Sequence, residues 1–418
     1  MTSDPDWSRL WHDPPGDVPH TPLDEETRRR LDLPHTLLPT PEGLTRPAVF
    51  DPALKHRQSG FRAGEPRFED ETAAHVWHRA RRTALDVVLA AIADGPWSDH
   101  LMLRGSVLMA TWFPGAARDP GDLDFVVVPE DWSMDGPRTA DLLTDIARDA
   151  AAASARTPVR IDAAAMVTED IWTYERVPGR RMLLPWTAPG IPGGTVQLDF
   201  VFNEPLPAPP VPTELRPLGE GPGCRLLAAS PALSLAWKLV WLVNDRYPQG
   251  KDLYDAVLLA DHTPPTYDMV RGALVLAGED GLIPAGHWWL DNLGYVDWDG
   301  FDDDHPSVTV DHEALGARLI RALEPLFAEA RRPDEPAYDR WARWLAPLIG
   351  TARPVTDLAD SGPYGLRAAV IITRERAGRQ RLTLDEALHS VLTDHEKWRY
   401  WREKPDLRRD FFSEEGLS

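Results

Sequence analysis

The sequence predicts an α/β N-terminal half, in which helices and strands alternate, followed by an α-helical C-terminal half. Before residue 203, amphipathic segments of helical length alternate with short apolar segments of strand length. After the seven prolines of residues 203–223, the apolar positions recur almost entirely at helical spacing. The 418 residues suffice for two or three domains, and a hydrophobic content of 43% suffices for a sizeable core.

The elements of the N-terminal half follow from this patterning in chain order. Ten prolines between Pro5 and Pro52, without a sustained period, predict an irregular arm. A long amphipathic helix is expected over residues 68–94, because apolar residues recur there every three or four positions until Gly95-Pro96. Further strands are predicted at 101–103, 122–128, 159–167, 171–177 and 195–202, and further helices at 107–112 and 138–155.

The C-terminal half is predicted to be helical. Ser230 is a typical N-cap with proline at the first helical position, and it opens a helix that runs to about Asp245. Residues 291–313 hold eight acids and no Lys or Arg, which predicts a solvated loop. The other predicted helices start near Lys251 and cover 311–332, 337–350 and 383–403.

Charge and composition limit the class of partner. A net charge of −21 excludes a globally basic nucleic-acid binder, although a local basic groove stays open. No membrane span is expected, since Lys238 interrupts the most apolar helical stretch, residues 233–243. The first residues lack the basic and apolar parts of a signal peptide, and the single Cys224 excludes an intramolecular disulfide. We therefore expect a cytoplasmic protein without a membrane or disulfide partner.

Two aspartates open an apolar strand. Asp122 and Asp124 are at positions i and i+2, so their side chains share one face, with Cα atoms roughly 6.6 Å apart at about 3.3 Å per residue. Paired carboxylates repel each other unless a cation lies between them. A metal site is therefore expected at the mouth of this strand, and a solvated strand start is the structural alternative.

Two further features would complete such a site. Gly105-Ser106 lies between a predicted strand and helix, where backbone N–H groups and a hydroxyl suit a triphosphate, although an ordinary turn explains it when taken alone. Asp199 is a lone charge in an apolar strand, which is costly unless it faces a site or solvent at a sheet edge. Beside residues 122–128 it would complete a cluster able to hold two Mg²⁺ ions roughly 3.5–4 Å apart.

The last feature is a lysine in a predicted helix, with two aspartates in the helix that follows. Lys238 lies among apolar residues and needs a partner, either a phosphate or a nearby carboxylate. Asp252 and Asp255 share a helical face at i,i+3 and are such carboxylates.

Taken together, these features on strand, turn and helix have an order that resembles the AbiEii/AbiGii toxin family. The resemblance covers about residues 70–262. Family members are nucleotidyltransferases of the DNA polymerase β-like superfamily that act in bacterial toxin–antitoxin and phage-defence systems, and some transfer nucleotides to the 3′ end of tRNA. The segments that carry the resemblance are Leu103-Arg104-Gly105-Ser106, Asp122-Leu123-Asp124-Phe125, Leu198-Asp199-Phe200, and the Lys238 helix followed by Lys251-Asp252-Leu253-Tyr254-Asp255.

The resemblance implies an α+β fold with a polymerase β-like nucleotidyltransferase core, a mixed sheet with flanking helices, in residues 67–223. A Pro-rich arm of residues 1–66 would precede it, and an α-helical domain of residues 224–418 would complete the cleft. It implies an Mg²⁺-dependent enzyme, with two ions and with Mn²⁺ as an alternative, that moves a nucleoside monophosphate from a nucleoside triphosphate to an acceptor hydroxyl. The implied acceptor is an RNA or tRNA end, and an antitoxin protein is a further implied partner.

The roles of individual residues also come from the resemblance. The implied metal ligands are Asp122, Asp124 and Asp199, which together with Lys238 form the implied catalytic set. The implied triphosphate-binding residues are Gly105, Ser106, Lys238, Arg246, Lys251, Asp252 and Asp255.

Other functions remain open from the sequence alone. The same chemistry could act on a small molecule or on a protein hydroxyl. A protein of a different class, an NTP-binding sensor or interaction module without catalysis, could keep the same fold. The basic C-terminal stretch, residues 367–409, carries interleaved aromatic residues and is either an RNA-binding surface or a charged, solvated helix.

Overall fold

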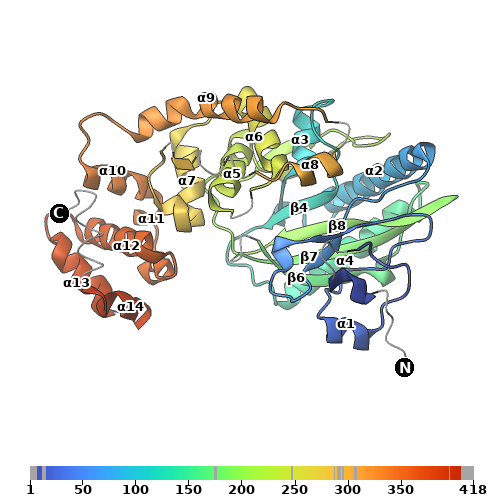
Figure 1. The fold of residues 1–418 in the computed structure, drawn as a ribbon, viewed down its shortest axis with the longest axis horizontal. Coiled ribbons are helices and arrows are strands. Elements are labelled where there is room, and N and C mark those ends of the chain that lie inside the picture. The colour runs from blue at the N-terminus through green and yellow to red at the C-terminus, as the bar shows by residue number, and fades with distance from the viewer. Residues whose placement is uncertain are drawn as a thin grey trace. The chain divides into compact units, whose positions relative to one another are not determined.

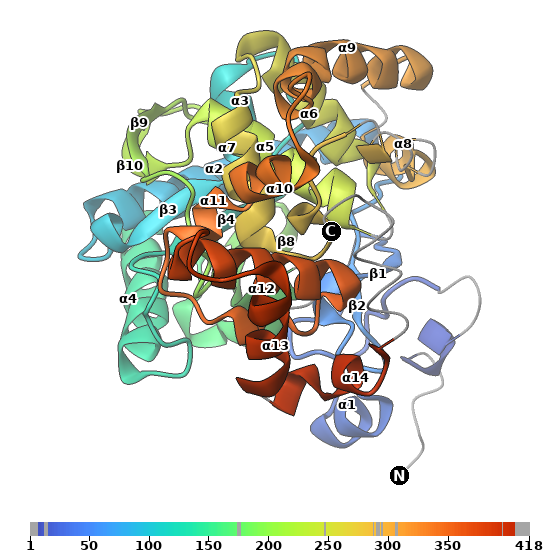
Figure 2. The same ribbon diagram turned by 90° about the vertical axis from the view of Figure 1, so that its left-hand side faces the viewer.

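A computed structural model describes residues 7–11, 16–173, 177–245, 248–286, 288–289, 293, 296–305, 308–394 and 396–405. The chain divides into two compact units (Figures 1 and 2). Unit 1 comprises Met1–Glu204 and Pro210–Ala229, and unit 2 comprises Pro205–Pro209 and Ser230–Ser418. The helical part of unit 2 thus begins at Ser230 rather than at residue 224, because Cys224–Ala228 is a strand of unit 1.

Unit 1 is built on a mixed sheet. Among the described residues, eight strands join in the order β5-β7-β8-β4-β3-β10-β9, with β6 paired to β7. The pairs β4–β8 and β3–β10 are parallel, and the other pairs are antiparallel. The predicted mixed sheet is therefore confirmed. Its strands are β3 (Leu101–Arg104), β4 (Asp122–Val127), β5 (Arg160–Ile161), β6 (Val167–Thr173), β7 (Val177–Ala188), β8 (Ile191–Val201), β9 (Val211–Leu215) and β10 (Cys224–Ala228).

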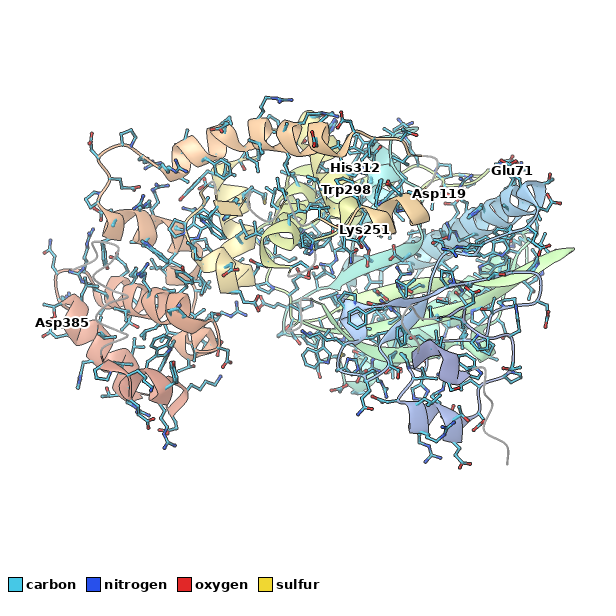
Figure 3. All side chains as sticks on the ribbon, viewed as in Figure 1. Glu71, Asp119, Lys251, Trp298, His312 and Asp385 are labelled. Carbon is cyan, nitrogen blue, oxygen red and sulfur yellow. The ribbon has the colours of Figure 1, made fainter. Side chains whose placement is uncertain are left out.

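Helices flank this sheet as predicted. Helix α2 (Glu71–Asp94) starts after Asp70, whose carboxylate accepts the N–H of Thr72 at 2.7 Å, and it ends before Gly95. It packs against α4 (Pro137–Ser154) and against β8, while the short α3 (Ser106–Trp112) connects β3 to the loop before β4. Asp119 of that loop, labelled in Figure 3, pairs with Arg82 of α2 at 2.8 Å and so connects the loop to this helix.

The predicted strand boundaries between residues 159 and 202 were partly wrong. The predicted strand 159–167 is a two-residue strand followed by a 3₁₀ turn (Ala163–Ala165), and β7 was missed. Prolines at 178 and 185 and the adjacent Arg180 and Arg181 hide the strand pattern of β7. Strands β9 and β10 were also missed. Strand β9 lies inside the Pro-rich segment, and β10 directly follows it.

The N-terminal segment, residues 7–66, is more regular than an arm. It forms a hydrophobic cluster of its own and belongs to unit 1. Its elements are a 3₁₀ helix (Trp7–Trp11), α1 (Glu25–Leu31), β1 (Ala48–Phe50), the 3₁₀ helix η2 (Pro52–Leu54) and β2 (Phe61–Ala63). The cluster consists of Trp7, Leu10, Val18, Leu31, Leu33, Leu37 and Ala48.

The named elements of unit 2, within its described residues, are all helices, as predicted. Helices α7 (Tyr267–Ala277) and α12 (Gly362–Ala377) were not predicted. Gly272 weakens the helical sequence pattern of α7, and Gly362-Pro363 at the start of α12 reads as a turn. Residues 299–304, predicted as a loop, form the short α8. The helices are α5 (Pro231–Asn244), α6 (Gly250–His262), α7 (Tyr267–Ala277), α8 (Asp299–Asp304), α9 (His312–Ala330), α10 (Ala337–Trp344), α11 (Ala346–Ile349), α12 (Gly362–Ala377), α13 (Leu384–Asp394) and α14 (Arg399–Arg402).

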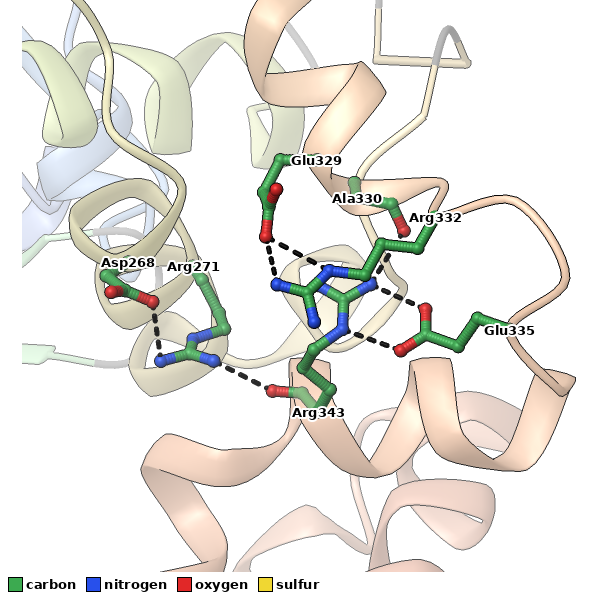
Figure 4. A network of polar contacts seen from close by, with 7 residues as sticks. All are labelled: Asp268, Arg271, Glu329, Ala330, Arg332, Glu335 and Arg343. Carbon is green, nitrogen blue, oxygen red and sulfur yellow. Dashed lines mark hydrogen bonds and ion pairs between the residues drawn. The ribbon is translucent and has the colours of Figure 1, made fainter.

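Aromatic and polar contacts hold unit 2 together. Trp289 packs against Phe327 and Trp344, with ring centroids 5.8 and 6.0 Å apart. Figure 4 shows a polar network of the same unit, in which Arg271 donates to the carbonyl of Arg343 at 3.0 Å and Arg343 pairs with Glu335 at 2.6 Å. These contacts tie α7 to α10. Throughout the described part of both units, the helices fall short of the combined length and apolar character that crossing a bilayer requires.

Candidate active site

The Gly105-Ser106 turn joins β3 to α3. Gly105 has φ +82°, a conformation that L-residues rarely adopt. A Cβ at this position would lie 2.5 Å from Oδ2 of Asp124, so only glycine allows the backbone to approach this carboxylate so closely. Ser106 is buried, and its hydroxyl donates to Oδ1 of Asp122 at 3.4 Å. The turn and the two aspartates therefore form one local structure.

Asp122 and Asp124 lie on one face of β4, and both are half-buried. Alternate residues point to the opposite face, where Leu123 and Phe125 are fully buried and Phe125 stacks on Phe200 of β8 at 5.7 Å. Because these apolar residues fix which face of β4 is covered, the two carboxylates are held on the other face.

A row of charged residues crosses this same face of the sheet. Strand pairing sets Asp124 beside Arg104 on β3 and beside Asp199 on β8, and it sets Arg181 on β7 between Asp199 and Glu169 on β6. Directly paired residues project to the same side of a sheet, so the five side chains form a continuous row. Arg104 at the near end is itself paired with the buried Glu204 at 2.8 Å.

Asp199 is held by a buried arginine. Nε and Nη2 of Arg181 each donate to one carboxylate oxygen of Asp199 at 2.8 Å, and Nη1 donates to Asp51 at 2.5 Å. Gln197, the β8 residue paired with Asp122, also donates to Asp199 at 3.2 Å. Asp199 thus lies beside Asp124 in the sheet but has Arg181 as its closest partner.

Burial dominates the electrostatics of this group. Burial raises the pKa of Asp199, Arg181 opposes the shift, and the neighbouring Asp122 and Asp51 carboxylates add to it, so the net shift is upward. Burial also acts to raise the pKa of Asp51, but Arg181, together with Arg62 and the Ala53 N–H, outweighs it and the pKa of Asp51 falls. Burial acts to lower the pKa of Arg181, and its two carboxylates reverse this, so Arg181 stays charged.

The two carboxylates on β4 form a partial metal site of the kind that Mg²⁺ uses, rather than a preformed cage of three carboxylates. Within the described ranges, no group of three or more His, Cys, Asp or Glu side chains is arranged to hold a metal ion. Mg²⁺, however, is commonly held by one or two carboxylates together with substrate phosphates. Asp122 and Asp124 provide such a pair, half-buried and on one face. Each oxygen of Asp199 has two acceptor positions, so its bonds to Arg181 leave further acceptor capacity.

The predicted residues of unit 2 form a separate buried cluster. Nζ of Lys238 on α5 bonds Asp252 at 2.8 Å and Asp255 at 2.9 Å, both on α6, and it lies 4.4 Å from the ring centre of Trp241. Lys238, Asp252 and Asp255 are 4, 6 and 0% exposed, so this lysine does not reach solvent along the helix surface. Of the two partners considered for Lys238, the carboxylates are the ones it contacts.

Lys251 and Arg246 are the other predicted triphosphate-binding residues in this part of the chain. Lys251 lies in the first turn of α6 and is half-buried (Figure 3). The start of this helix is packed by Trp298, which stacks on His312 with ring centroids 4.1 Å apart. Arg246 lies outside the described residues.

Sequence reasoning missed Arg181, Asp51 and Gln197. A lone Asp199 in an apolar strand signals a need for a cation, and Arg181 in the missed strand β7 supplies it. Asp51 carried no signal, because its contact with Arg181 joins positions 130 residues apart.

The Gly105 geometry makes a testable prediction. Gly105→Ala should lower any transfer activity by ~10²-fold, because the new methyl group displaces the Asp124 carboxylate from the turn. Gly115→Ala is the matched control: Gly115 also has a positive φ, +86°, but nothing lies within 4 Å of its added Cβ. Steady-state kinetics of both variants test this, and equal losses would show that backbone strain alone is responsible.

A family model described as nucleotidyl transferase AbiEii toxin, type IV TA system, matches residues 87–361, about two thirds of the chain. The matched range includes the Gly105-Ser106 turn, the row from Arg104 to Asp199, and the Lys238 cluster, whereas Asp51 precedes it. The chain matches no curated protein.

Proposed function

The chain belongs to the AbiEii family of nucleotidyl transferase toxins, and we propose that it moves a nucleoside monophosphate from a nucleoside triphosphate to an acceptor hydroxyl. The observation that carries this proposal is the Asp122 and Asp124 pair packed against the Gly105-Ser106 turn. The family assignment establishes the general class of reaction and toxin, while the nucleotide, the metal and the acceptor are parts of the proposal.

Asp122 and Asp124 are the residues that would hold Mg²⁺ or Mn²⁺, with Asp199 contributing from the neighbouring strand. When bound, the two ions would neutralise phosphate charge and stabilise the attacking and leaving oxygens. The fixed pairing of β4 with β8 keeps the carboxylates in place before substrate arrives, which lowers the cost of organising the site during the reaction.

The remaining roles belong to the chain's own groups. The Gly105 turn brings backbone N–H groups and the Ser106 hydroxyl to the triphosphate. The acceptor oxygen attacks the α-phosphorus, the bond to the bridging oxygen breaks, and pyrophosphate leaves. Asp199 is the proposed acceptor of the hydroxyl proton. Lys238 is proposed as a phosphate contact supported by Asp252 and Asp255, and Lys251 and Arg246 as further triphosphate contacts; this assignment rests on the family resemblance.

RNA, in particular a tRNA 3′ end, is the proposed acceptor, and an antitoxin protein is the proposed partner. The net charge of −21 repels a polyanion at long range. RNA binding should therefore depend on a few local phosphate contacts and weaken steeply as salt concentration rises.

The experiment that tests the proposal identifies the acceptor directly. Purified protein is incubated with Mg²⁺, each α-³²P-labelled nucleoside triphosphate in turn and total cellular RNA, and the RNA, protein and small-molecule fractions are separated. Label in the RNA fraction with one nucleotide supports the proposal. Label in the protein or small-molecule fraction would move the acceptor to that class, and no label in any fraction with intact nucleotide binding would favour a nucleotide sensor.

A further inference from the structure

Asp51 reaches the row of charged residues from the N-terminal segment. It lies before the range that the family model matches, yet its Oδ2 accepts the Arg181 Nη1 proton at 2.5 Å. The Nε and Nη2 groups of the same arginine donate to the two carboxylate oxygens of Asp199. Arg181 therefore connects the N-terminal segment to a carboxylate of the proposed active site.

These three side chains form a closed, buried set. Asp51, Arg181 and Asp199 are 6, 4 and 8% exposed, so each charge depends on the others for compensation. The guanidinium is planar and its donors have a fixed geometry, which means that its orientation sets the orientation of the Asp199 carboxylate.

Asp51 is itself held rigidly. Its Oδ1 accepts the N–H of Ala53 at 3.0 Å as the cap of η2, and its own N–H donates to the carbonyl of Gly60 at 2.8 Å. Each carboxylate oxygen of Asp51 thus accepts a hydrogen bond, Oδ1 from the local turn and Oδ2 from Arg181. A residue with this many fixed contacts is suited to fixing Arg181 in one position.

We propose that Asp51 and Arg181 are positioning residues of the transfer reaction, which orient Asp199 and make the N-terminal segment part of the catalytic apparatus. This inference rests on the proposed function. Its structural alternative is that Asp51 only fastens the N-terminal segment to the sheet.

A second ion pair separates these explanations. Arg57 of the same segment bonds Glu169 of β6 at 2.6 Å and Asp32 at 3.1 Å. Glu169 is the next residue in the charged row after Arg181. Arg57 therefore fastens the same segment to the same sheet through Glu169 rather than through Arg181 and Asp199, and it provides the matched control.

The test compares full-length Asp51→Ala, Asp51→Asn and Arg57→Ala proteins. Circular dichroism and urea unfolding identify which variants are folded. Electron paramagnetic resonance then measures Mn²⁺ affinity, and steady-state kinetics give kcat and KM for the nucleotide. Asp51→Ala should lower Mn²⁺ affinity or kcat by roughly 10–100-fold with little change in KM. Asp51→Asn, which keeps a hydrogen-bond acceptor, should recover part of this loss, and Arg57→Ala should stay within about 2-fold of the wild type.

Equal effects of Asp51→Ala and Arg57→Ala would overturn the inference, because fastening alone would then explain both. Wild-type Mn²⁺ affinity and kcat in the Asp51 variants would overturn it as well. If Asp51→Ala does not fold, the comparison of Asp51→Asn with Arg57→Ala decides the question. Failure of the proposed function has a different signature: Asp124→Asn would then also leave Mn²⁺ affinity unchanged.

Discussion

Asp124→Asn should reduce nucleotide transfer by ~10³-fold or more while leaving the fold intact, because metal placement dominates phosphoryl transfer. The amide is nearly the size of the carboxylate but lacks its charge. Asp124 lies between Arg104 and Asp199 in the charged row, and its carboxylate lies directly against the Gly105 turn. Single-turnover kinetics with labelled nucleotide measure the loss, and circular dichroism confirms the fold.

Asp131→Asn is the matched control for this variant. Asp131 follows the same strand but is exposed to solvent, and its replacement should leave the rate within about 2-fold of the wild type, as expected for a surface substitution. A transfer rate in Asp124→Asn close to that of Asp131→Asn would contradict the assignment of β4 as the metal-binding strand.

Lys238→Met should lower the free energy of unfolding of the protein by ~3–5 kcal/mol, because it leaves the buried Asp252 and Asp255 carboxylates without their cation. Urea unfolding measures the loss. Lys404→Met, at an exposed position, should stay within about 0.5 kcal/mol of the wild type.

A triple variant distinguishes loss of charge compensation from loss of packing around Lys238. Adding Asp252→Asn and Asp255→Asn to Lys238→Met removes the unpaired charges, so the triple variant should be more stable than Lys238→Met alone. A triple variant that is less stable than the single one would show that the carboxylates stabilise unit 2 through contacts other than those with Lys238.

The parts of the site that local sequence determines could be predicted. Asp122 and Asp124 are two residues apart in one strand, and Gly105-Ser106 lies at a strand-to-helix turn, so short-range geometry fixes both. Ser230 caps α5 as expected, with its hydroxyl accepting the N–H of Leu233 at 3.2 Å. The division into an α/β half and an α-helical half followed from hydrophobic periodicity and from the Pro-rich boundary between them.

The parts that depend on long-range pairing could not be predicted. Strand β7 contains two prolines and two adjacent arginines, so its sequence does not show the alternation of a strand. Its arginines are tolerated because Arg181 is paired with Asp51 and Asp199, and Arg180 with Asp170. Since Asp51 belongs to a Pro-rich segment without periodicity, only the folded structure brings it to Arg181.

The most direct test of nucleotidyl transfer is to run parallel reactions with α-³²P- and γ-³²P-labelled nucleotide, using wild-type protein and Asp124→Asn. Attack at the α-phosphorus leaves the α-label on the acceptor and releases the γ-label in pyrophosphate. We predict that wild-type protein transfers only the α-label and that Asp124→Asn transfers neither. Transfer of the γ-label to the acceptor, or equal α-label transfer by the two proteins, would contradict nucleotidyl transfer by the β4 carboxylates.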